Sequence, residues 1–374
     1  MAGPDHIPVA QPDLGGNEAE YVLRAVQSSW IGPTGEFVTR FEREFAAACG
    51  TAEAIAVSNG TVALHLAMLA LGIGPGDEVI VPSLTYIATA NAVRYVGAEP
   101  VFVDVTPDVW CLDPQQLAGA LTERTRAIVP VHLYGHPADM DPITAFAREH
   151  DLYVVEDAAE APLATYRGRV VGGLSDIATF SFFGNKVLTS GEGGAVTLSN
   201  PKLAARARLL RGQGMDPQRR YFFSVVGHNF RLTNVACALL CAQLERAGEM
   251  VATRRRLVAL YRELLAGVPG IHPQQVAPWA VPTPWLFSVT VDAHAFGRDR
   301  DALAEALAAR GIETRPFFIP IHTLPPYGDS ARDQGAELPV TDDVAARGLN
   351  LPTASSFTEQ HVRAVTEAIA DLAR

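Results

Sequence analysis

The chain has 374 residues, of which 48% are hydrophobic, and its formal net charge is -11 at pH 7. This length and composition predict a globular protein with a large core, built as two domains or as one large domain with a smaller one. The acidic balance and the lack of a long basic run argue against a nucleic-acid partner. The beginning MAGPDHIPVAQPDL has no signal-peptide pattern, and the apolar runs are short. We therefore expect a cytoplasmic protein with no membrane partner.

Between Ala54 and Asn200, short β-branched runs alternate with helical patterns, and two further helical patterns precede them. The expected strands are AIAVS, EVIVP, VFVDV, RAIVPVHL, LYVVED, IATFSFF and GAVTLS, and the expected helices among them are TVALHLAMLAL and YIATANAVRYV. This alternation predicts an α/β fold with a large, doubly wound and mostly parallel sheet. Ligands of such sheets bind beyond the carboxyl ends of the strands.

A long helical pattern follows from Asn234 to Ala266, and we expect it to break near Gly248. The Pro-rich stretch VAPWAVPTPW then leads to the strand pattern WLFSVTV, the helix pattern DRDALAEALAARG and an amphipathic helix from Thr358 to Arg374. The sequence therefore predicts a large domain over residues 1–250, which includes the N-terminal helical segment, and a smaller C-terminal α+β domain over residues 251–374.

Lysine is rare in this chain, because 28 of its 30 basic residues are arginine. Lys202 follows Asn200-Pro201 at the start of a predicted helix, where a surface charge is ordinary. Lys186 instead lies in SFFGNK, shortly before GEGG, where glycines allow a planar ligand to approach the backbone. Since a guanidinium stays protonated, a lysine at this place indicates imine chemistry. The four cysteines form no C-x-x-C pair and H-E-x-x-H is absent, so we expect no metal site.

Two other motifs fit a phosphate-bearing cofactor. Ser58-Asn59-Gly60-Thr61 ends a predicted strand and opens a helix, which suits either an anion site or an ordinary helix cap. Glu156-Asp157 ends a buried strand, where the carboxylate suits a pyridinium nitrogen, a helix cap or an arginine. Neither G-x-x-x-x-G-K-[ST] nor a strand-linked G-x-G-x-x-G occurs, which argues against a P-loop or a nicotinamide site. Together with Lys186, these motifs are the set that pyridoxal 5'-phosphate (PLP) requires.

The sequence resembles the DegT/DnrJ/EryC1/StrS family of sugar aminotransferases, which have the fold type I of PLP-dependent transferases. The resemblance covers essentially the whole chain. It is carried by GNEAEYV, SSWIGPTGEFV, SNGTVALHLAMLALGIGPGDEVIVPSLTYIATANAV, VEDAAEA, DIATFSFFGNKVLTSGEGG, RGQGMDP, GHNFRLTN, ETRPFFIPIHTLPPY and RGLNLP. Within the family, the chain is most similar to the perosamine-type branch, which aminates C4 of nucleotide-linked 4-keto-6-deoxyhexoses. The FGNK form with Asn185 before the lysine also points to 4-amination.

The resemblance implies that Lys186 is the catalytic lysine, which carries PLP and moves the proton between cofactor and substrate carbons. Glu160 stands where most relatives have Gln. The implied cofactor contacts are Asp157 to the pyridine nitrogen, Glu160 to the ring hydroxyl, Tyr86 to the ring face, Gly60, Thr61 and Ser181 to the phosphate, and Asn229 to the phosphate across the interface of a homodimer. The implied substrate contacts are His322, which could also be a structural loop histidine, and Arg231 and Arg315, which suit a diphosphate or a carboxylate.

The resemblance also implies a two-step reaction. L-Glutamate would leave its amino group on the cofactor, giving pyridoxamine 5'-phosphate and 2-oxoglutarate, and GDP-4-keto-6-deoxymannose would then be converted to GDP-perosamine. A dTDP-4-keto-6-deoxyglucose substrate and amination of a C3-keto sugar or a cyclitol are the alternatives. A non-catalytic regulator is disfavoured by the retained Lys186, Asp157 and Ser181, and the related C3 dehydratases have His at the position of the lysine. Antibiotic-sugar and surface-polysaccharide biosynthesis both remain open.

Overall fold

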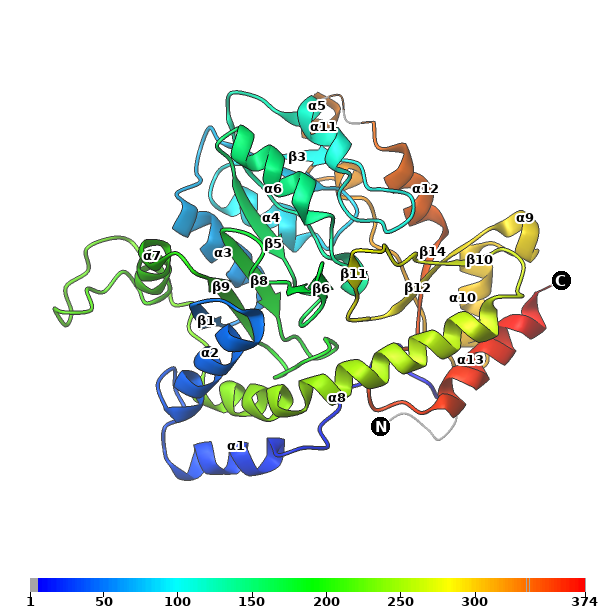
Figure 1. Cartoon of the computed structure of the whole chain (residues 1–374), viewed down its shortest axis with the longest axis horizontal. Coiled ribbons are helices and arrows are strands. Elements are labelled where there is room, and N and C mark those ends of the chain that lie inside the picture. The colour runs from blue at the N-terminus through cyan, green and yellow to red at the C-terminus, as the bar shows by residue number, and fades with distance from the viewer. Residues whose placement is uncertain (1–5, 334, 336, 374) are drawn as a thin grey trace.

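The computed structural model describes residues 6–333, 335 and 337–373, and its largest element is a seven-stranded sheet (Figure 1). The strands in spatial order are β1 (Glu53–Val57), β9 (Gly194–Leu198), β8 (Ile177–Ser181), β5 (Tyr153–Asp157), β4 (Thr125–Ile128), β2 (Glu78–Pro82) and β3 (Glu99–Val103). β9 is antiparallel to both of its neighbours, whereas the remaining neighbouring pairs are parallel. This confirms the expected mostly parallel sheet.

Helices cover both faces of this sheet. Because successive residues of a strand point to opposite faces, each strand contributes side chains to both helix layers. Along β1, Ala54 and Ala56 join the buried cluster that includes α2 (Glu36–Cys49), whereas Ile55 joins the cluster of α3 (Gly60–Leu71). The other helices of this part are α1 (Glu18–Gln27), α4 (Ala88–Tyr95), α5 (Leu117–Ala120), α6 (Met140–Glu149) and α7 (Pro201–Arg211). The carboxyl ends of the parallel strands therefore remain open at one edge of the sheet.

All seven strand predictions and both helix predictions between Ala54 and Asn200 are confirmed. The run RAIVPVHL forms a shorter strand than expected, because β4 ends at Ile128, two residues before Pro130, which has no N–H for the ladder. The chain then forms a 3-10 turn, Leu133–Gly135, in which Tyr134 has a φ of 55°. Just before this turn, His132 N–H donates to the Asp157 carbonyl at 3.0 Å, which ties the segment to the end of β5.

The helix α8 (Asn234–Leu265) is continuous, so the break expected near Gly248 is wrong. A glycine costs a helix only about 1 kcal/mol relative to alanine. A Cβ built at Gly248 meets no atom within 4 Å, so the glycine lies on an open face of the helix. Meanwhile α8 packs against α1 and α2 near one end and against α13 (Glu359–Leu372) toward the other. These contacts outweigh the local preference of one residue, and Figure 1 shows α8 as one long rod.

A second, smaller sheet lies beside the C-terminal half of α8 (Figure 1). Its strands, in the order β10 (Ile271–Pro273), β12 (Phe287–Val291), β14 (Gly348–Leu351) and β13 (Arg315–Pro316), are antiparallel. Residues of this sheet form a core of their own with α8, α10 (Arg300–Ala308) and α13. This confirms the smaller α+β unit; the boundary at residue 250 remains a prediction.

The remaining elements are short. They are the three-stranded sheet of β11 (Ala280–Val281), β6 (Thr165–Tyr166) and β7 (Arg169–Val170), the helices α9 (Ala293–Phe296), α11 (Gly328–Asp333) and α12 (Pro339–Arg347), and the 3-10 turns Pro114–Gln116 and Ile321–Thr323. Within the described residues, no helix combines the length and the apolar character needed to cross a membrane.

Candidate active site

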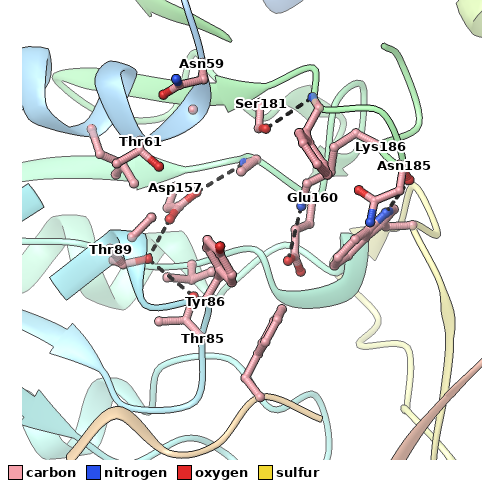
Figure 2. Close-up of a pocket in the computed structure, with 18 of the residues that line it drawn as sticks. Asn59, Thr61, Thr85, Tyr86, Thr89, Asp157, Glu160, Ser181, Asn185 and Lys186 are labelled. Carbon is pink, nitrogen blue, oxygen red and sulfur yellow. Dashed lines mark hydrogen bonds and ion pairs between the residues drawn. The ribbon is translucent and has the colours of Figure 1, made fainter. Parts of the chain in front are cut away.

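A cavity of about 440 Å³ lies at the carboxyl end of the large sheet, and segments of the small sheet close its other side. Eight of the residues expected to bind cofactor or substrate, or to mark the substrate class, line it: Gly60, Thr61, Tyr86, Asp157, Glu160, Ser181, Asn185 and Arg315, together with the catalytic candidate Lys186. In Figure 2, Asn59 and Thr61 lie on the opposite side of Asp157 from Glu160 and Asn185. The motifs singled out in the sequence therefore meet in one cavity.

One end of the cavity is built for an anion. Asn59 caps α3, since its Oδ1 accepts the N–H of Val62 at 2.9 Å, and the first N–H groups of a helix point out of its end. A Cβ built at Gly60 would lie only 2.7 Å from the Cβ of Ser181, so a glycine lets α3 approach β8 this closely. The helix end and the hydroxyls of Thr61 and Ser181 together can hold a phosphate.

Asp157 is buried at the end of β5, near the middle of the cavity. Its Oδ2 accepts a hydrogen bond from the Thr89 hydroxyl at 2.8 Å, and its Oδ1 accepts one from the N–H of Ala159 at 3.2 Å. Burial raises the pKa of Asp157, while the Thr89 bond and the nearby Lys186 charge act in the opposite direction. A buried carboxylate held by neutral donors favours a cationic N–H in the cavity.

Lys186 and Glu160 lie beside each other, with Nζ 3.4 Å from Oε1. The second Glu160 oxygen accepts the N–H of Tyr134 at 2.7 Å, so the left-handed turn after β4 holds this carboxylate. Burial lowers the pKa of Lys186, and the two nearby carboxylates oppose this effect. Burial likewise raises the pKa of Glu160 against the charge of Lys186. A lysine in these surroundings can supply the neutral amine that nucleophilic attack requires.

The sequence did not reveal two residues of this site. Thr89 lies inside a predicted helix, and only the fold shows that its hydroxyl reaches Asp157. Trp285 lies in the Pro-rich stretch far from Lys186 in sequence, yet the lysine Nζ lies over the face of its ring, 3.6 Å from the ring centroid. In the sequence, the only sign of this contact is a tryptophan inside a Pro-rich connection, and that pattern does not identify Lys186 as its partner.

Three expected site residues do not line the cavity. His322 instead contacts side chains outside the cavity lining: its Nδ1 is 2.8 Å from the Ser83 hydroxyl after β2, and its Nε2 is 3.4 Å from the Asp342 carboxylate in α12. Asn229 is the last residue of the arm, which we define as residues 212–229 and which projects from the molecule in Figure 1, and Arg231 follows it by two residues. There the Arg231 Nε donates to Asn229 Oδ1 at 2.8 Å. The roles expected for these residues remain predictions.

Known proteins resemble this chain along almost its full length. The family model for the DegT/DnrJ/EryC1/StrS aminotransferase family matches residues 12–370. A GDP-perosamine synthase of Caulobacter vibrioides is 50% identical, with 99% of each chain covered. A dTDP-3-amino-3,4,6-trideoxy-alpha-D-glucose transaminase of Streptomyces venezuelae is 43% identical over 95% of this chain and 92% of that protein.

A solved structure supports the same assignment. DesV of S. venezuelae superimposes with a TM-score of 0.89 and 41% identity, covering 95% of this chain and 94% of its own. The family match, the shared fold and the lysine in a cavity with two carboxylates agree with one another. The chain belongs to the DegT/DnrJ/EryC1/StrS aminotransferase family.

Proposed function

We propose that this PLP-dependent aminotransferase moves the amino group of L-glutamate to C4 of GDP-4-keto-6-deoxymannose and so forms GDP-perosamine. The observation that carries the proposed roles of the site residues is the Lys186 amine beside the Glu160 carboxylate, in the same cavity as Asp157. The choice of sugar nucleotide is supported by the 50% identity to a GDP-perosamine synthase.

The residues of the cavity fit PLP. The close approach of α3 at Gly60, with Thr61 and Ser181 beside it, suits the phosphate group. Asp157 suits the pyridine nitrogen, because its burial favours a cationic donor. Glu160 suits the ring hydroxyl. When bound, PLP accepts the electron pair of the carbon–hydrogen bond that breaks during amino transfer.

Lys186 has two tasks in this proposal: it attaches the cofactor, and it moves a proton when it is free. Its neutral amine takes the proton from the donor carbon, and its ammonium form returns a proton in the next step. Glu160 orients the amine, while Tyr134 N–H fixes the Glu160 carboxylate. Tyr86, which lines the cavity with its ring 5.8 Å from that of Phe318, suits the ring face of the cofactor.

We further propose a homodimer in which Asn229 completes the site of the second subunit. The arm supports this, because it exposes apolar side chains that a monomer would leave in water, with Tyr221 72% and Val226 89% exposed. Trp30 and Ile31 are exposed in the same way before α2. We place the enzyme in the cytoplasm, where its proposed substrates, a nucleotide sugar and glutamate, are metabolised.

The test distinguishes the GDP-linked substrate from the dTDP-linked one. The enzyme is loaded with pyridoxamine 5'-phosphate, and the return of the PLP absorbance is followed after adding GDP-4-keto-6-deoxymannose or dTDP-4-keto-6-deoxyglucose. We expect a rapid return with the GDP sugar. Lys186→Ala should abolish turnover, whereas Lys202→Ala removes the other lysine, which is exposed, and should leave turnover unchanged. Turnover by the Lys186→Ala variant would contradict the proposed role of this lysine.

Amination at C3 of a dTDP sugar is the second candidate. It is favoured by the 43% identity to the S. venezuelae transaminase. No return of absorbance with either 4-keto sugar, combined with a rapid return with a dTDP-3-keto sugar, would replace the first proposal by this one.

A further inference from the structure

The amine of Lys186 lies beside two groups that come from different parts of the chain. On one side is the Glu160 carboxylate, 3.4 Å away, from the loop after β5. On the other is the face of Trp285, whose ring centroid is 3.6 Å from Nζ, from the segment before β12. An ammonium ion is attracted to the face of an aromatic ring, and tryptophan is the strongest of the aromatic partners.

Trp285 is held firmly in this position. Its indole N–H donates to the carbonyl oxygen of Asn185, the residue before the lysine, at 2.8 Å. Its backbone N–H donates to the Tyr134 carbonyl at 3.2 Å, and its own carbonyl accepts from Arg254 at 2.9 Å. The residue is only 5% exposed. Because all of its hydrogen-bonding groups are satisfied, the ring presents a fixed face to the lysine.

We propose that Trp285 is a positioning residue for Lys186: its indole face and the Glu160 carboxylate form a resting site for the lysine amine whenever that amine is free. The inference rests on the role proposed above for Lys186, which must release the cofactor and attach to it again. A lysine has a long, flexible side chain, so a free amine without such a site would sample many rotamers. The resting site keeps the amine next to the cavity in a single arrangement.

The site also balances the two protonation states that the lysine needs. Burial lowers the pKa of Lys186, which favours the neutral amine. The indole face and Glu160 attract the ammonium form and so oppose this effect. A purely structural Trp285 would only fill space, and removing its aromatic face would leave the titration of the lysine unchanged. The two roles therefore differ in a property that can be measured without turnover.

The test uses protein labelled with ¹³C at the lysine Cε and prepared without cofactor. The chain has only two lysines, so two signals are expected, and Lys202 provides an exposed reference on the same molecule. Lys202→Arg assigns the signals. In the parent protein we expect the Lys186 signal to be shifted upfield by the ring current of the indole.

Two variants separate the aromatic face from the indole N–H. Trp285→Leu removes the face and should abolish the upfield shift and lower the titration midpoint of Lys186 by about one pH unit. Trp285→Phe keeps an aromatic face but loses the bond to the Asn185 carbonyl. Its Lys186 upfield shift and titration midpoint should therefore lie closer to those of the parent protein than the values of Trp285→Leu do. The Lys202 signal and the circular dichroism spectrum check that each variant is folded. If the Lys186 shift and midpoint in Trp285→Leu equal those of the parent, the inference is wrong.

A second measurement separates this inference from the proposed function. Borohydride reduction of the PLP-loaded protein, followed by peptide mass analysis, shows whether Lys186 carries the cofactor. Absence of the modified peptide in the parent protein would overturn the role of Lys186, whereas the cofactor-free titration does not depend on that role. Rapid mixing of PLP with cofactor-free protein should show about tenfold slower attachment in Trp285→Leu. Equal attachment rates in parent and variant would count against the resting site.

Discussion

Replacing Arg254 by methionine should destabilise the protein by about 3 kcal/mol. Arg254 is 1% exposed, and its Nη1 donates to the carbonyl oxygens of Trp285 at 2.9 Å, Thr353 at 3.1 Å and Pro284 at 3.4 Å. Burial lowers the pKa of Arg254 to about 10, and at about 1.4 kcal/mol per pKa unit this charge costs about 3 kcal/mol to bury. Bonds from a charged donor contribute about 1.5 to 3 kcal/mol each, so the two shorter bonds offset that cost.

Methionine removes both the cost and the bonds, but it leaves the carbonyl oxygens buried without donors, at about 1 to 3 kcal/mol each. For a chain of 374 residues, a net loss of 3 kcal/mol lowers Tm by about 4 °C. Differential scanning calorimetry measures this shift. Arg256→Met is the matched control, because Arg256 is exposed on the same helix. A Tm of Arg254→Met within 1 °C of the control would refute the reasoning.

Three further outcomes follow from the geometry. Gly60→Ala forces its new Cβ against Ser181, so PLP affinity measured by absorbance titration should fall about tenfold or more, whereas Gly119→Ala, which has open space, should bind normally. Asp157→Asn should keep PLP but lose about 100-fold or more in kcat, and a loss below tenfold would contradict its role. Burial lowers the pKa of His136 to about 4, so the unfolded chain binds this proton near pH 6.5 while the folded protein does so only near pH 4. Stability is therefore lost as the pH falls between these values, by up to about 3 kcal/mol, and Tm should fall less between pH 7 and pH 5 in His136→Gln than in the parent.

The strands and the cavity motifs could be predicted because their signals are local. A β-branched run such as EVIVP is a strand in most contexts, and the parallel order places Asp157 and Ser181 at one edge of the sheet. The resemblance then named the role expected for Lys186. These steps need only short segments of sequence and the general rule for the ends of parallel strands.

The rest depends on contacts between distant segments. Trp285 reaches Lys186 only because the segment before β12 packs into the core beside the large sheet, and no periodicity encodes that contact. The break expected at Gly248 failed because packing along α8 outweighs the preference of one glycine. Asn229 and Arg231 do not line the cavity, and their place outside it depends on how the segment between α7 and α8 folds, which no local pattern encodes.

The unbroken course of α8 restricts how the two sheets can move relative to each other. A hinge at residue 250 would require a helix to bend at a point where Met250, Val251 and Arg254 are buried. Any closure over the cavity must therefore use the strand connections on the other side, where the chain passes through Trp285 and Arg315. By the same reasoning, a polypeptide cut at residue 250 would end inside a helix and expose its apolar stripe, so the two parts of this enzyme would have to be separated elsewhere to fold alone.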